Sequence, residues 1–287
     1  MKRLTLLALF AIACGAVPVQ AQALSLGYHA GDTYKYTYHS ATKQTVTAAG
    51  VSLPADIELS ANEAVSIKSV DSSGTADLAI TLSNFSVTST TRGVTSTTPV
   101  MPDTTMDVTL AADGRILSLD GNQLAGSNPF LAFSGMGGGF FVTAVLPSNP
   151  VKPGDTWSKD YDQANPAGTG STGAIHITSH SKYLRNEFLN GVNAAVVETT
   201  SSGAVNMSLE FPASGADLAG TGRFTIAGTV TSDVITWIDT SGHRVLKTHA
   251  TETNAGTLNL GGLTTALPGL TGPITIKGTG ATDLNPA

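Results

Sequence analysis

An alternation of apolar and polar residues at every second position is the feature that most constrains the fold. It recurs along the chain, in segments 65–68, 78–82, 106–110, 224–226 and 234–238. Successive side chains of a β-strand point to opposite faces of the sheet, so this pattern buries one face and leaves the other in water. The abundant Thr, Val and Ile residues fit the same structure, because β-branched side chains pack well on a pleated surface.

Turn-forming dipeptides separate these segments. They are Asp-Gly at 113–114, Asn-Gly at 190–191 and Ser-Gly at 241–242. Such pairs favour tight β-hairpins, because Gly and Asn adopt positive φ angles at low cost. No segment after residue 23 has an apolar stripe at the 3.6-residue spacing of an amphipathic helix. The sequence therefore predicts an all-β, antiparallel protein.

Short motifs return in the same order in the second half of the chain. Gly-Asp-Thr-Tyr at 31–34 returns as Gly-Asp-Thr-Trp at 154–157, and the turn at Gly74 is matched by the turn at Gly191. The Asp-Gly turn at Gly114 corresponds in turn to Ser-Gly at Gly242. The spacing of about 120 residues predicts a tandem duplication. We expect two similar antiparallel halves, curved sheets or half-barrels, over residues 24–127 and 151–287.

The connector between the halves, residues 128–150, is apolar, aromatic and rich in Gly and Pro. An exposed linker is normally polar, so we expect a buried strap that packs the two halves together. The alternative is a mobile flap over an apolar pocket, with glycines supplying backbone freedom. On that reading, the candidate side chains lining an apolar ligand are Phe130, Phe133, Met136, Phe140 and Phe141, together with Tyr34 and Trp157.

The first 23 residues have the pattern of a secretory signal peptide. Lys2 and Arg3 precede an uncharged apolar run, and small residues with the A-x-A spacing follow at 21–23. The run is shorter than the roughly 20 residues that a membrane-spanning helix needs. We expect export to the periplasm or the cell exterior, with cleavage after Ala21 or after Ala23.

Cys14, the only cysteine, lies within this segment. The residues before it loosely match a lipoprotein signal, so the alternative is cleavage before Cys14 and a lipid anchor on that residue. Cleavage further along would leave a mature chain without disulfide or thiol chemistry.

Charge composition restricts the partners. Only 13% of the residues are charged and the formal net charge is −6, whereas typical globular proteins have about 25% charged residues. A mildly acidic, lysine-poor surface does not attract polyanions. We expect no nucleic-acid partner and no transmembrane segment in the mature chain.

Motifs for catalysis, cofactors and metals are absent from the sequence or stand in the wrong structural context. Residues 168–173 match G-x-G-x-x-G, but they follow a loop and precede a strand, whereas the phosphate-binding version opens a helix. His176 and His180 lie four residues apart on an expected strand, about 13 Å from each other, too far to bind one metal ion. No G-x-S-x-G motif occurs. The sequence predicts no catalytic, cofactor or metal residues, and a protein that is not an enzyme.

Three of the motifs, at 31–34, 113–115 and 151–157 (Val-Lys-Pro-Gly-Asp-Thr-Trp), resemble a family of bacterial exported proteins and lipoproteins that has no assigned activity. This resemblance implies a β-rich, two-part protein of the cell envelope, and it supplies no site residues.

Three functions remain open on the sequence. The first is a non-catalytic envelope protein that binds a hydrophobic small molecule or lipid between its β halves. The alternative is a structural or interaction module whose partner is another envelope protein. The third is a hydrolase with an unrecognised site.

Overall fold

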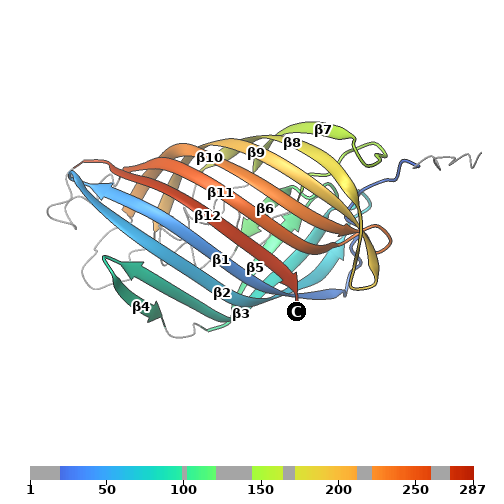
Figure 1. Cartoon of the computed structure of the whole chain (residues 1–287), viewed down its shortest axis with the longest axis horizontal. Helices are drawn as coiled ribbons and strands as arrows, with labels where there is room; N and C mark the ends of the chain where they lie inside the picture. The colour runs from blue at the N-terminus through green and yellow to red at the C-terminus, as the bar shows by residue number, and fades with distance from the viewer. Residues whose placement is uncertain (1–19, 99–101, 121–143, 164–171, 212–221, 260–271) are drawn as a thin grey trace, which may run out of the picture.

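The computed structural model describes residues 20–98, 102–120, 144–163, 172–211, 222–259 and 272–287. These residues form a single twelve-stranded antiparallel sheet (Figure 1). The predicted all-β antiparallel class is confirmed. In this part of the chain no helix is long and apolar enough to cross a membrane.

The first half of the chain forms a meander, in which each strand on the main path of the sheet pairs with the next one along that path. Its strands are β1 (Thr33–Ala48), β2 (Val51–Val70), β3 (Ala76–Thr91), β4 (Val94–Thr98), β5 (Thr104–Leu110) and β6 (Ile116–Asp120). The short strand β4 pairs only with β3 and lies off the main path of the sheet.

The second half forms a longer meander of the same kind. Its strands are β7 (Thr156–Gln163), β8 (Thr172–Leu189), β9 (Val192–Phe211), β10 (Gly222–Asp239), β11 (Val245–Asn259) and β12 (Ile274–Pro286).

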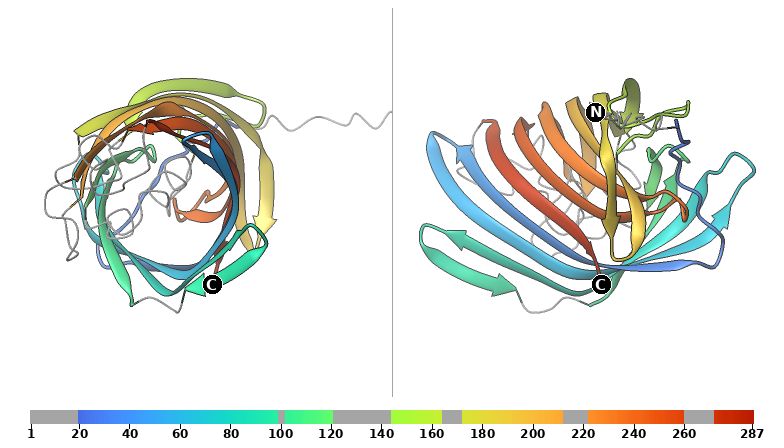
Figure 2. Two further views of the ribbon diagram at one scale, coloured as in Figure 1. Left: turned by 90° about the vertical axis from the view of Figure 1, so that its left-hand side faces the viewer. Right: turned by 45° about the vertical axis from the view of Figure 1, so that its right-hand side comes forward.

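The two meanders join edge to edge through β1 and β12, which lie side by side in Figure 1. Their antiparallel register runs from Tyr36 opposite Pro286 to Thr47 opposite Thr275. The strand order is therefore β6-β5-β3-β2-β1-β12-β11-β10-β9-β8-β7. Figure 2 (left) shows these strands curling around a common axis. Strands β6 and β7 are the edges of the described sheet, which is not closed by hydrogen bonds.

Equivalent backbone contacts at the start of each half support the duplication. Gly31 and Gly154 have φ angles of 94° and 97°, in the left-handed region that glycine tolerates. Their amides donate to the carbonyls of Ile67 and Tyr183, respectively, at 2.9 and 2.7 Å. The aspartate after each glycine accepts a hydrogen bond from the amide of that same Ile67 or Tyr183. The Gly-Asp-Thr motif thus docks a first strand onto a second strand in both halves.

Irregularities in the ladders recur at matching places. The β2–β3 ladder shifts register between Ile67 and Ser69, and the β8–β9 ladder shifts between Tyr183 and Arg185. The β5–β6 and β10–β11 ladders also shift register, in each case next to the turn that joins the two strands. Such bulges bend and twist a strand locally. Strands β1, β2, β3, β5 and β6 therefore correspond to β7 through β11, and β12 lies between the two repeats.

One end of the curved sheet is covered by two segments outside the strands, residues 22–28 and 144–151. Gln22 and Val151 exchange two backbone hydrogen bonds of 2.8 and 2.9 Å. The Leu26 amide donates to the carbonyl of Ala112 at 3.0 Å, and the Gly27 amide donates to that of His243 at 2.7 Å. These contacts tie the covering segments to turns of both halves. We call the end of the curved sheet that residues 22–28 and 144–151 cover the capped end.

The main hydrophobic core fills the capped end. The covering segments contribute Leu24, Leu26, Tyr28, Ala144, Leu146 and Val151. The strands of both halves contribute the remaining members, including Leu78, Leu82, Tyr183 and Ile238, each no more than 1% exposed. The core therefore lies between the inner face of the sheet and the two covering segments.

Gly228 on β10 marks a place where neighbouring strands come very close. A Cβ atom there would lie 2.3 Å from the Ala255 carbonyl oxygen and 2.7 Å from the Gly256 Cα atom of β11. Both contacts are with backbone, which cannot rotate away. Gly228→Ala should therefore lower the free energy of unfolding by about 2 kcal/mol, measured by denaturant unfolding. Gly203→Ala, whose added Cβ would meet atoms at 3.1–3.3 Å, is the milder control. An equal loss in both variants would contradict this reading of Gly228.

Candidate functional site on the inner face

The inner face of the curved sheet carries three zones between the capped end and the opposite end. Along β1, buried Tyr36 and Tyr38 belong to the main core, Ser40, Thr42 and Gln44 follow, and Val46 and Ala48 come last. All these residues share one face, because they alternate with exposed positions. The zones are thus apolar, polar and apolar in that order.

The second apolar zone forms a hydrophobic cluster separate from the main core. We call it the apolar band. Its buried members come from β8 to β12, and they are Ile175, Val205, Met207, Ile226, Val230, Leu258, Ile274 and Ile276. Val46, Ala48 and Ile177 pack against them.

The polar zone between the two clusters has members on β1, β8, β9, β11 and β12, and we call it the polar belt. Every member is less than 10% exposed, and most have small side chains. The members are Ser40, Thr42, Gln44, Ser179, Ser181, Thr199, Glu252, Asn254 and Thr282. Within the belt, Ser181 and Thr199 are hydrogen bonded at 2.8 Å, and the Thr282 hydroxyl donates to Ser40 at 3.1 Å.

Two glycines of β12 shape the middle of the belt. Gly280 lies opposite Thr42 of β1 and Glu252 of β11, and Gly278 lies opposite Asn254. A Cβ atom on Gly280 would meet Thr42 Oγ1 at 3.1 Å and Glu252 Oε1 at 3.3 Å. A Cβ atom on Gly278 would meet Asn254 Oδ1 at 2.9 Å. The absence of side chains on β12 therefore lets Glu252 and Asn254 lean across it toward β1.

One polar atom of Glu252 and one of Asn254 lack a hydrogen-bond partner. Glu252 Oε2 and Asn254 Oδ1 are buried and unpaired. Burial raises the pKa of Glu252 from 4.5 to about 7, because the carboxylate loses its hydration. Buried polar groups are paired in the great majority of cases, so two adjacent unpaired acceptors are unusual. They can accept hydrogen bonds from a donor group brought by a ligand.

A second buried carboxyl lies at the border of the main core. Glu63 on β2 is 2% exposed, lies opposite Tyr36 of β1, and has neither carboxyl oxygen hydrogen bonded. Burial raises the pKa of Glu63 well above 4.5. Since Leu59, Val65 and Ile67 of the same strand are all apolar and buried, we assign Glu63 to the core and not to the candidate site.

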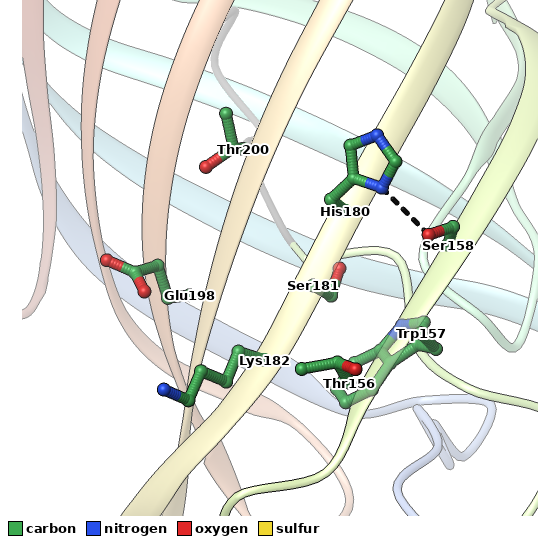
Figure 3. A pocket seen from close by; sticks show the side chains of 8 residues that line it. All are labelled: Thr156, Trp157, Ser158, His180, Ser181, Lys182, Glu198 and Thr200. Carbon is green, nitrogen blue, oxygen red and sulfur yellow. Dashed lines mark hydrogen bonds between the residues drawn. The ribbon is translucent and has the colours of Figure 1, made fainter.

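A hollow of about 350 Å³ lies over β7, β8 and β9 (Figure 3). Ser158 and His180 point toward one another there, with 2.8 Å between Ser158 Oγ and His180 Nδ1. Lys182 and Glu198 lie beside them on the neighbouring row. Ser158 and His180 are exposed, and no carboxylate of the described residues is hydrogen bonded to His180. A serine nucleophile needs a base that is itself oriented by a third group, so this pair does not form a triad.

The two histidines considered as metal ligands have separate partners on the outer face. His180 contacts Ser158, whereas His176 Nδ1 lies 2.9 Å from Asp162 Oδ1. The described residues contain no group of three or more His, Cys, Asp or Glu placed to hold a metal ion.

Of the side chains predicted to line an apolar ligand, Tyr34 and Trp157 lie at the capped end, partly buried against the main core. Tyr34 donates a hydrogen bond to Asp32 at 2.8 Å, and Trp157 Nε1 donates to the Val145 carbonyl at 2.7 Å. Both side chains therefore pack at the capped end, and Trp157 lies opposite Ser181 at the edge of the polar belt. Phe130, Phe133, Met136, Phe140 and Phe141 lie outside the described residues.

Sequence reasoning missed the polar belt, although a signal for it exists. Tyr36 and Tyr38 show which positions of β1 face inward. Every second residue after them, namely Ser40, Thr42 and Gln44, faces inward as well. Polar residues at the inward-facing positions of a strand are the pattern that marks such a belt.

Comparison with protein-family models and with curated proteins finds no match for the chain.

Proposed function

We propose that the protein is a non-catalytic binding protein of the bacterial cell envelope, which holds an apolar small molecule or a lipid against the inner face of its curved sheet. The observation that carries this proposal is the apolar band. A domain usually has one contiguous hydrophobic core with smaller clusters under long loops, whereas here the second cluster spans five strands and the polar belt separates it from the first. Ligand sites are concave and mostly apolar, with a few polar groups that fix orientation.

The proposal predicts a bound ligand on protein prepared without detergent. Native mass spectrometry of the protein purified from a bacterial envelope should show an adduct of lipid or small-molecule mass that organic extraction removes. Ile276→Ser, within the apolar band, should reduce the adduct severalfold, because it removes apolar contact and adds a polar group. Thr275→Ser, on the exposed face of the same strand, is the matched control and should keep the adduct.

A clean apo mass on correctly folded protein would count against the proposal. A stoichiometric complex with another envelope protein, without a small-molecule adduct, would support an interaction module instead. An adduct retained by both variants would place the ligand away from the apolar band.

We further propose that the chain is exported and cleaved after Ala21. The Gln22 side-chain Nε2 atom donates to the Tyr183 hydroxyl, and its backbone pairs with Val151. Cleavage after Ala23 removes these contacts, whereas cleavage after Ala21 keeps them.

The intact mass of protein secreted by a bacterial host should therefore correspond to a chain beginning at Gln22. A chain beginning at Leu24 would contradict the proposed cleavage site, and a lipid-modified Cys14 would establish a membrane anchor instead.

A further inference from the structure

We infer that the centre of the polar belt, Glu252 and Asn254 with Thr42, is a recognition site for the primary ammonium group of an amphiphile, whose apolar chain lies along the apolar band. This inference rests on the proposed function and specifies the class of ligand.

Unsatisfied acceptors are the first argument. Glu252 is 8% exposed and Asn254 is 5% exposed, yet Glu252 Oε2 and Asn254 Oδ1 have no hydrogen-bond partner. An unpaired buried acceptor costs free energy, which a donor from a ligand recovers on binding. Because both side chains project from the inner face of β11 two residues apart, their Cβ atoms are separated by about 7 Å, and one small donor group can lie between them.

The convergence of three side chains over β12 is the second argument. With no side chain at Gly278 or Gly280, Glu252 and Asn254 extend over the β12 backbone, and Thr42 Oγ1 borders the same place from β1. Small residues dominate the rest of the belt. The acceptor atoms of Glu252, Asn254 and Thr42 therefore converge over the backbone of β12, between β11 and β1.

Charge decides the chemistry of that group. The buried polar residues of the described chain include acids, amides and hydroxyls, and no Lys, Arg or His. A carboxylate or phosphate would face Glu252 with no compensating cation. A primary ammonium carries three donors and one positive charge, which suits the Glu252 carboxylate, the Asn254 carbonyl oxygen and the Thr42 hydroxyl. Hydrogen bonds between charged groups are about twice as strong as neutral ones.

The apolar band continues directly from this site. Moving along each strand away from the capped end, Ile276 lies two positions from Gly278 on β12, and Val46 lies two positions from Gln44 on β1. Leu258 lies four positions from Asn254 on β11 in the same direction. All three point to the inner face and lie on the side away from the capped end. An alkyl chain attached to the ammonium would therefore run along the band toward that opposite end.

The test compares three probes that share one chain length and differ in head group: dodecylamine, dodecanol and dodecanoate, each below its critical micelle concentration. Binding to the full-length mature protein is measured by isothermal titration calorimetry at neutral pH, after delipidation. We expect dodecylamine to bind about tenfold more tightly than dodecanol, and dodecanoate to bind most weakly. Glu252→Gln should abolish the preference for the amine over dodecanol, because it removes the negative charge that selects an ammonium group. Glu198→Gln, on the exposed face of β9, should retain the preference.

Each other outcome has a defined meaning. Equal binding of the three probes, or preference for dodecanoate, overturns the ammonium site while the proposed function stands. An amine preference that survives in Glu252→Gln places the head group elsewhere and also overturns it. Failure of all three probes to bind to the folded protein contradicts the proposed function itself. Circular dichroism and thermal unfolding of each variant confirm that the comparison is made on folded chains.

Discussion

Tyr183→Ala should lower the free energy of unfolding by about 4 kcal/mol, measured by denaturant unfolding. Tyr183 is 0% exposed and is among the largest fully buried side chains of the described residues. It joins the main core from β8, and its hydroxyl contacts Gln22 of one covering segment and Asn186 of its own strand. The substitution leaves a cavity where the sheet meets the capped end, and it removes both hydrogen bonds.

Two variants separate these contributions. Tyr183→Phe keeps the ring and should cost only about 1 kcal/mol, the usual value of a lost hydrogen bond. Phe188→Ala is the control, because it also removes an aromatic ring from β8, but Phe188 is 75% exposed. We expect it to change the free energy of unfolding by no more than about 0.5 kcal/mol. Similar losses for Tyr183→Ala and Phe188→Ala would show that the capped end is not the main core.

Stability should fall as the pH rises from about 5 to 7. The pKa of Glu252 is raised from 4.5 to about 7 by burial, so the folded protein binds a proton that the unfolded chain has already released. The contribution of Glu252 to the free energy of unfolding is therefore fully present below pH 4.5, and it is lost as the pH rises to about 7. The loss amounts to roughly 3 kcal/mol. Burial raises the pKa of Glu63 as well, which adds a loss of the same sign.

The measurement is the free energy of unfolding at intervals between pH 5 and 8. Glu252→Gln and Glu63→Gln, which stay neutral, should each flatten the profile and be more stable than the original chain above pH 7. Glu58→Gln, on the exposed face of the strand that carries Glu63, should leave the slope unchanged. A profile that rises with pH in this window would mean that Glu252 and Glu63 acquire partners in solution.

The class of the fold follows from local sequence because alternation fixes which face of each strand is buried. On β1, Tyr36 and Tyr38 are inward while Lys35 and His39 are exposed, as the alternation predicts. The predicted turn at Asn190 and Gly191 is also present, with both residues at positive φ. Each of these features depends on neighbours within a few residues, so a single sequence is enough to predict them.

The pairing of distant strands follows from no local signal. Gly-Asp-Thr motifs predict two similar halves, but nothing in β1 or β12 shows that they are partners. The candidate site depends on that pairing, because Thr42 and Glu252 meet only where β12 brings β1 and β11 together. On the sequence, Tyr34 and Trp157 are candidates for a ligand wall only as the alternative to packing, and both pack against the main core at the capped end.

The ladder between β1 and β12 also affects how the chain reaches its native state. Strand β1 is synthesised near the start of the chain, yet one of its two neighbours is the strand that ends at Pro286. Until that strand is available, one edge of β1 has unpaired backbone groups and is a template for pairing with other chains. Contacts between such distant residues form slowly, because closing a long loop costs entropy before any pairing compensates for it. We therefore expect refolding on a timescale of milliseconds to seconds or slower, and a need for holdase chaperones that keep the nascent chain from aggregating.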